Sequence, residues 1–181
     1  YFNGLGGASD RRVVLRDQLI LLLMHGGGLR ESETLHLWIE DVLIDPFNLN
    51  SVKVRIYHPE DGKAPNNWRG RSGKTTRAAY LKEKYALSPR NDLMGKKHVG
   101  WKSRVTDSKE EYLEVHWFPT IFGEVFSKLW QDYTRFLTIL ERNHPYAFVN
   151  FHHKHIGNAY TLNAFNNNYH QALKRIGLKP C

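Results

Sequence analysis

Apolar residues recur at helical spacing near the start of the chain and predict two successive helices. The first runs from about Asp10 to His25, and the second from about Glu31 to Trp38. Ser9 or Asp10 carries a side-chain oxygen suited to cap the first helix. Its expected buried side comprises Val13, Val14, Leu19, Leu22 and Leu23, and its polar side comprises Arg11, Arg12, Arg16 and Asp17. In the second helix, Leu35 and Trp38 are expected to pack inward.

The next segment alternates between apolar and polar residues, which predicts a half-buried strand from Ser51 to His58. A turn over 45–48 precedes it, because Asp, Pro and Asn favour turns. Residues 75–81 predict a second strand. The two strands would form a hairpin whose long connection, 59–74, is polar and basic.

The second half of the chain predicts further helices. Residues 82–115 lack a clear period and are interpreted as an insertion with a short helix near 91–95. A long helix is predicted over 119–141, and a short strand over 147–150. Thr161 is placed to cap a last helix that ends at Gly177, with Leu162, Phe165, Tyr169, Leu173 and Ile176 buried. The expected fold class is α+β and mainly helical.

Size and charge narrow the class of protein. The 181 residues suffice for one domain, and the net charge of +8 favours a polyanionic partner such as nucleic acid. No apolar run reaches the roughly 20 residues that span a bilayer, so no membrane is expected. The single cysteine, Cys181, excludes a disulfide framework. A reducing, cytoplasmic location is the simplest expectation.

The segment between the first two helices carries the strongest candidate chemistry. Gly26, Gly27 and Gly28 allow a sharp turn, and Arg30 follows at the start of the second helix. Such a position would fix the guanidinium at the edge of a packed core. The ordinary alternative is an ion pair between Arg30 and Glu31 or Glu33.

The order of residues in this segment resembles the first arginine box of the tyrosine recombinases, the phage integrase family. The matching residues are Gly28, Leu29, Arg30, Ser32, Glu33, Leu37 and Asp41. The resemblance implies a recombinase-like catalytic domain with a small antiparallel sheet, acting on double-stranded DNA as a homo-oligomer. Recombinases of this family cut and rejoin DNA through a 3′-phosphotyrosine and require no metal or other cofactor. The long connection, the insertion and the aromatic late helix resemble recombinases of gamma-proteobacterial mobile elements.

The resemblance also assigns roles to particular residues. Arg30 would grip the scissile phosphate, and Glu33 would orient it. A lysine in the turn between two strands would serve as general acid, and here Lys74 is favoured over the alternative, Lys63. Cations of the connection and of the strand after it would contact DNA; they are Arg69, Arg71, Lys63 and Arg77.

The chain also departs from the family pattern. None of its ten histidines is followed by arginine three residues later, so the His-x-x-Arg box is missing, and no tyrosine stands in the nucleophile's context. The expectation is a partial catalytic domain, 1–181, without the N-terminal DNA-binding domain or the C-terminal box, and inactive by itself. The alternative is a non-catalytic DNA-binding or interaction module. A metal hydrolase that uses His152, His153 and His155 is a remote third possibility, because no carboxylate or cysteine stands nearby.

Overall fold

The computed structural model describes residues 4–103 and 109–179. These residues form five α-helices: α1 (Arg11–His25), α2 (Glu31–Thr34), α3 (Arg77–Tyr85), α4 (Ile121–Thr138) and α5 (Leu162–Arg175). They also form three strands: β1 (Val42–Asp45), β2 (Asn48–Tyr57) and β3 (Tyr112–Glu114). Single turns of 3-10 helix span Ile39–Asp41, Pro65–Asn67 and Gly95–Lys97. The α+β class with a small antiparallel sheet is therefore confirmed. None of the described helices is long and apolar enough to cross a membrane.

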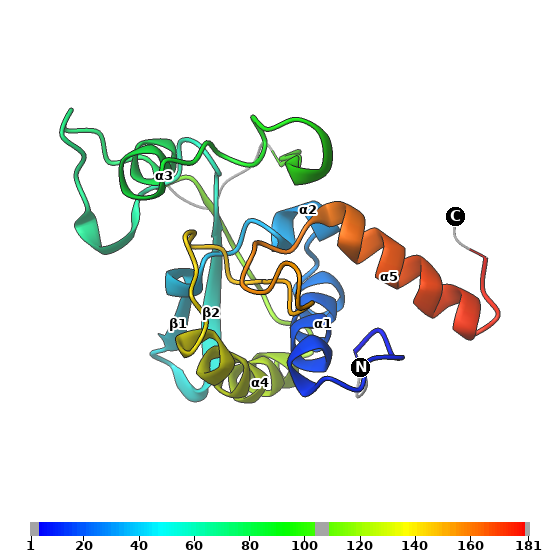
Figure 1. Cartoon of the computed structure of the whole chain (residues 1–181). Coiled ribbons are helices and arrows are strands. Elements are labelled where there is room, and N and C mark those ends of the chain that lie inside the picture. The colour runs from blue at the N-terminus through cyan, green and yellow to red at the C-terminus, as the bar shows by residue number, and fades with distance from the viewer. Residues whose placement is uncertain (1–3, 104–108, 180–181) are drawn as a thin grey trace.

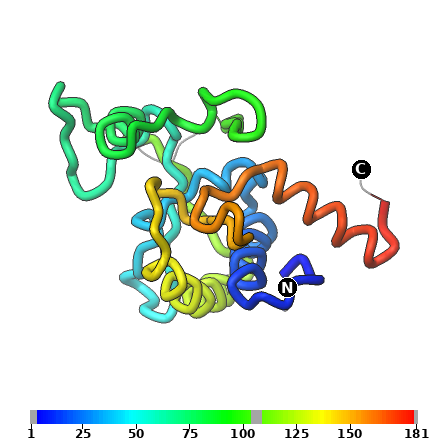
Figure 2. The backbone as a smooth tube through the Cα atoms, viewed as in Figure 1, coloured from blue at the N-terminus to red at the C-terminus, as the bar shows by residue number. Residues whose placement is uncertain are grey.

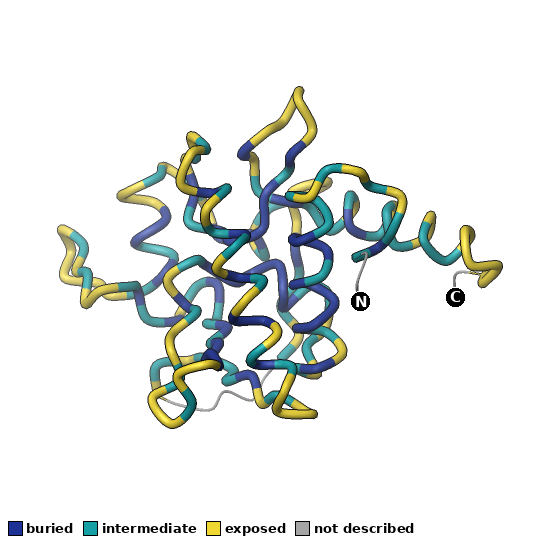
Figure 3. Tube along the Cα trace, turned by 90° about the horizontal axis from the view of Figure 1, so that it is seen from below, coloured by how far each residue is buried: buried dark blue, intermediate teal, exposed yellow. Residues whose placement is uncertain are grey.

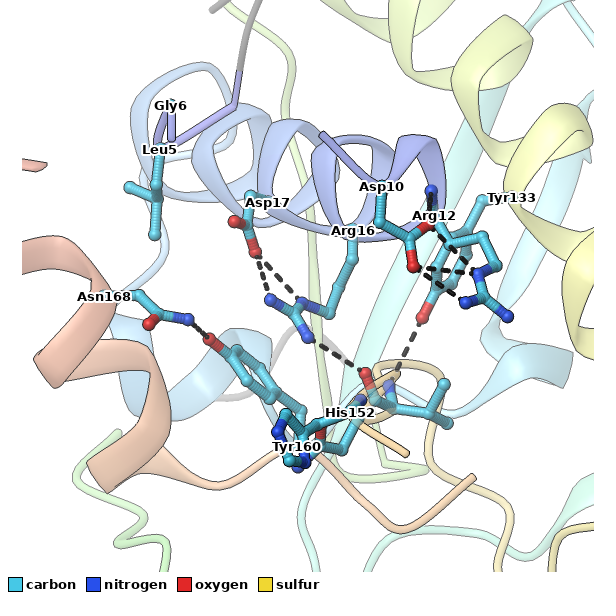
Figure 4. Close-up of polar contacts among 12 residues, drawn as sticks. Leu5, Gly6, Asp10, Arg12, Arg16, Asp17, Tyr133, His152, Tyr160 and Asn168 are labelled. Carbon is cyan, nitrogen blue, oxygen red and sulfur yellow. Dashed lines mark hydrogen bonds and ion pairs between the residues drawn. The ribbon is translucent and has the colours of Figure 1, made fainter. Parts of the chain in front are cut away.

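Helix α1 has the predicted bounds, and Asp10 caps it by accepting a hydrogen bond from the Arg12 backbone N–H at 2.9 Å. The predicted polar side is wrong for Arg16 and Asp17, which are both buried. The Arg16 guanidinium donates to the Asp17 carboxylate at 2.8 Å and to the Val149 carbonyl at 3.2 Å (Figure 4). Burial raises the pKa of Asp17, although Arg16 opposes the shift. The pair attaches α1 to the chain around Val149.

The second helix is much shorter than predicted, because α2 ends at Thr34. Beyond it the backbone runs beside residues 145–147: the Leu37 carbonyl accepts from the Ala147 N–H at 2.8 Å, and the Pro145 carbonyl from the Ile39 N–H at 3.2 Å. These bonds replace the helical ones. Leu35 and Trp38 are nevertheless buried, as predicted. The predicted strand over 147–150 is wrong, since this region contributes isolated bridges and no ladder.

The antiparallel sheet of the described residues has the order β1–β2–β3, with β2 at its centre. Val52, Val54 and Ile56 of β2 are buried, as the alternation predicted, and the predicted turn at 45–48 joins β1 to β2. The predicted partner strand over 75–81 is wrong. Thr76 caps a helix there, and α3 buries Tyr80 and Leu81.

The segment 82–115, predicted to be an insertion, contributes to the core within its described part. It supplies β3, and Val99 is buried. Arg90 is also buried: its guanidinium donates to the Leu35 carbonyl at 2.9 Å and to the Tyr160 carbonyl at 2.7 Å. The helical turn in this segment lies at Gly95–Lys97 and not at 91–95.

Helix α4 packs against both α1 and β2, and these elements contribute to the main core (Figure 1). The long helix predicted over 119–141 is confirmed as α4, which buries Phe126, Tyr133 and Leu137. Figure 3 shows buried residues gathered in the body of the molecule, with exposed residues along the loops and the distal part of α5.

Helix α5 projects from the body of the molecule (Figures 1 and 2). Thr161 caps it as predicted, by accepting from the Ala164 N–H at 3.1 Å, and Gly177 follows it with a φ of +76°. Of this described helix, Phe165 alone is buried. The prediction that Ile176 is buried is wrong, because 69% of it is exposed. Leu162, Tyr169 and Leu173 are only partly buried.

Candidate nucleic-acid interface

The three glycines between α1 and α2 fix where Arg30 lies. A Cβ on Gly27 would stand 2.7 Å from both the Leu23 carbonyl oxygen and the Val115 side chain, and Gly28 has a φ of +69°. Both features favour glycine. The turn places Arg30 at the residue that precedes α2, with an extended backbone. Arg30 therefore sits where a tightly packed turn meets a helix start.

The Arg30 side chain is held by a buried carboxylate. Oε1 of Glu33 accepts from the Arg30 guanidinium at 2.9 Å, and Oε2 accepts from the Arg30 backbone N–H at 2.9 Å. The Ser103 hydroxyl donates to Oε1 of Glu33 at 2.5 Å and accepts from the Arg30 guanidinium at 3.3 Å. The Glu33 side chain is 4% exposed, whereas the Arg30 side chain is 59% exposed.

This arrangement, named here the Arg30 cluster (Arg30, Glu33 and Ser103), leaves a fixed cation open to solvent. An arginine has five N–H donors in a planar fork, and the cluster engages only one edge of it. Such a group is suited to bind a phosphate or carboxylate with two parallel hydrogen bonds. The predicted pairing with Glu33 is present, and it does not close the site.

Sequence reasoning missed Ser103, and the structure shows how it is positioned. His36 lies in the core, with Nε2 3.1 Å from the Val99 carbonyl oxygen. The Trp101 ring packs edge-on against His36 and against His58, with ring centroids 5.7 and 5.5 Å apart. Burial lowers the pKa of His36 to about 3, so the imidazole is neutral. These contacts attach residues 99–101 to the core and bring Ser103 to Arg30.

The two candidate lysines lie in different surroundings. Lys74 is exposed in a tight turn, and its expected context is wrong because α3, not a strand, follows it. Lys63 lies close to the end of β2, and its Nζ is 2.5 Å from Oε1 of Glu110, near the start of β3. This hydrogen bond raises the pKa of Lys63. Because β2 pairs with β3, Lys63 is the candidate of the two that lies near the junction of paired strands.

The predicted DNA contact by Arg77 is wrong for this conformation, because its side chain is 1% exposed. The guanidinium forms two hydrogen bonds with the Asp41 carboxylate, at 2.9 and 2.5 Å. It also lies 4.0 Å from the Trp38 ring centroid and 4.2 Å from that of Tyr57. Arg77 and Asp41 thus form a buried structural ion pair.

Arg69 and Arg71 are exposed on the connection after β2, where contact with a polyanion is sterically open. The Glu83 carboxylate accepts from the Arg71 backbone N–H at 3.1 Å and fixes this loop on α3. A cavity of about 570 Å³ lies beside Arg69 and Lys63. Its wall also contains Lys109, which sequence reasoning missed, since nothing in the local pattern distinguishes it from other surface lysines.

The histidine cluster lies on an exposed loop, as predicted for a solvent-facing segment. His152, His153 and His155 are all exposed, and the rings of the first two lie 4.2 Å apart. Within residues 4–103 and 109–179, no three histidine, cysteine or acidic side chains form a group that could hold a metal ion. The described loop therefore offers no metal centre by itself.

Comparisons of the chain with protein-family models, with curated proteins and with solved structures each found no significant match.

Proposed function

We propose that this chain is the DNA-binding part of a tyrosine recombinase catalytic domain, in which Arg30 binds a backbone phosphate. The observation that carries the proposal is the Arg30 cluster. A buried carboxylate and a hydroxyl hold one edge of the guanidinium, while more than half of the side chain is exposed. Arg30 and Glu33 both belong to the segment that resembles the family's first arginine box.

The chemistry of strand cleavage explains why such a group is useful. When a tyrosine attacks a DNA phosphate, the transition state carries additional negative charge on the phosphate oxygens. A guanidinium that is already oriented stabilises this charge without reorganisation, and preorganised donors are generally the largest catalytic contribution. Glu33 would act through Arg30 as a positioning residue. The sequence lacks the His-x-x-Arg box, and none of its tyrosines stands in the nucleophile's context. In the complete enzyme, such a box and a nucleophilic tyrosine would supply the remaining steps.

The chain itself would therefore bind duplex DNA without cutting it. The test measures the affinity for a fluorescent duplex by anisotropy across a series of salt concentrations. Replacement Arg30→Ala should weaken binding by up to about tenfold, because one phosphate contact is lost. The slope of log affinity against log salt concentration, called the salt slope, should decrease in magnitude by about one. Arg30→Lys should keep the slope and lose part of the affinity, since an ammonium lacks the planar fork.

The matched control is Arg135→Ala. Arg135 is an exposed arginine on α4, its side chain is 78% exposed, and its removal changes the net charge by the same amount. It should leave both the affinity and the salt slope close to those of the unaltered chain. If Arg30→Ala and Arg135→Ala behave alike, Arg30 is not a phosphate ligand and the proposal fails.

A further inference from the structure

The connection after β2 forms a cavity whose wall combines an aromatic ring with several cations. This cavity, named here the Trp68 cavity, has a volume of about 570 Å³. Its chemically distinctive residues are Lys63, Asn67, Trp68, Arg69, Lys109 and Glu110. Cavities of this size hold small organic ligands. We propose that the Trp68 cavity receives one unpaired nucleotide of a bound DNA strand; this inference rests on the proposed function.

The indole of Trp68 supplies a wall for a base. Trp68 is partly buried, and it packs at right angles to Tyr80, with ring centroids 5.1 Å apart. Tyr80 is buried and packs on Trp38 at a centroid distance of 5.6 Å. The ring of Trp68 thus packs against an aromatic cluster and also lines the cavity. Stacking on such a ring binds any base, because every base has a π-face.

The loop that carries Trp68 is fixed by its own backbone. The Ala64 N–H donates to the Thr75 carbonyl at 2.8 Å, and the Gly70 N–H donates to the Lys74 carbonyl at 2.8 Å. Lys63 and Thr76 form an antiparallel bridge. These contacts close the loop at its base and near its tip. The part of the cavity wall that this loop supplies is therefore preformed, and the entropic cost of ordering it on binding is small.

The polar groups of the cavity include both cations and hydrogen-bond acceptors. Arg69 and Lys109 are exposed cations on its wall and suit a phosphate group. The Asn67 side chain and the Asp61 carboxylate can accept hydrogen bonds from the exocyclic amine of a base. The combination of an aromatic ring with anion-binding and amine-binding groups distinguishes this cavity from a surface that contacts only the backbone.

A duplex offers backbone phosphates to such a loop, but its bases are stacked on one another. An unpaired base is not held by a partner strand, so transferring it to an aromatic wall costs less than extracting a paired base. The Trp68 cavity should therefore favour DNA with an extruded or unpaired base. Adenine is the suitable probe, since it carries an exocyclic amine.

The test compares the affinities for two duplexes of equal length, one fully paired and one with a single unpaired adenosine at its centre. The unaltered chain should bind the second duplex at least about fivefold more tightly, the lower bound for stacking one base on an aromatic side chain. Replacement Trp68→Leu, which keeps apolar packing on Tyr80, should remove this preference. Trp68→Phe should retain part of it, because an aromatic face remains.

The matched control is Tyr85→Ala, which removes an aromatic ring from the same cluster but not from the cavity wall. It should retain the full preference. Equal binding of both duplexes by the unaltered chain would overturn the inference and leave the proposed function intact. A preference that survives in Trp68→Leu, or that Tyr85→Ala also removes, would likewise overturn it. Failure to bind either duplex would refute the proposed function and the inference together.

Discussion

Two buried histidines should make the stability of the chain depend on pH. Burial lowers the pKa of His36 to about 3 and that of His144 to about 4. Nε2 of each lies within hydrogen-bond distance of a backbone carbonyl oxygen, that of Val99 or of Gly157. At pH 5, both imidazoles are therefore neutral in the folded chain, whereas they bind protons in the unfolded chain.

The sign and size of the effect follow from proton linkage. Below the ordinary histidine pKa of about 6.5, the unfolded state binds protons that the folded state does not, so stability falls as the pH decreases. Between about pH 7 and pH 5, each histidine should cost about 2 kcal/mol of unfolding free energy, and the two together about 4 kcal/mol. The loss continues until the pH reaches the low pKa values of the folded state.

The assay is urea unfolding at a series of pH values. His36→Gln and His144→Gln keep a side-chain N–H that can reach the same carbonyl, and each should remove about half of the pH dependence. His153→Gln is the control, because His153 is exposed and its replacement should leave the profile unchanged. An unfolding free energy that stays constant between about pH 7 and pH 5 would contradict this prediction. A pH dependence that His36→Gln and His144→Gln leave unchanged would also contradict it.

Three further stability predictions follow from the buried contacts. Asp41→Ala should cost about 3–5 kcal/mol in urea unfolding, because it leaves the Arg77 charge buried without its partner; a loss near zero would mean that Arg77 is solvated. Tyr133→Phe should cost about 1–3 kcal/mol, because the Val149 N–H loses its acceptor at 3.2 Å, and an unchanged denaturation midpoint would contradict this. Phe165→Ala should increase hydrogen exchange in α5 far more than in α1, since Phe165 is the buried residue of α5. If the α5 amides are equally protected with and without the substitution, other contacts hold the helix.

The parts of the fold that sequence predicted well are those with a strong local signal. The alternation in β2 and the helical period in α4 each specify which face is buried, so both elements were found with nearly the observed bounds. The contact between Arg30 and Glu33 was also predictable, because it joins residues three positions apart at a helix start.

The errors arose where distant segments decide the structure. The local pattern places the charged Arg16 on the exposed side of its helix. Instead, the Val149 carbonyl and the Tyr160 ring, whose centroid lies 3.6 Å from the guanidinium carbon, form a buried site for it. The residues after Thr75 contain threonine and tyrosine, which favour strands, yet Thr76 caps a helix whose buried face meets Trp38. No local signal marks Ser103, since its partners lie about 70 positions away.

The most direct test of phosphate binding by Arg30 is an NMR titration of the arginine Nε–H signals with duplex DNA. Arg30 is assigned by the loss of its signal in Arg30→Lys. The Arg30 signal should shift as DNA is added, because its guanidinium is exposed and oriented. The signals of the buried arginines Arg16, Arg77 and Arg90 should remain nearly unchanged. An Arg30 signal that stays in place while DNA binds would contradict the central claim that Arg30 is a phosphate ligand.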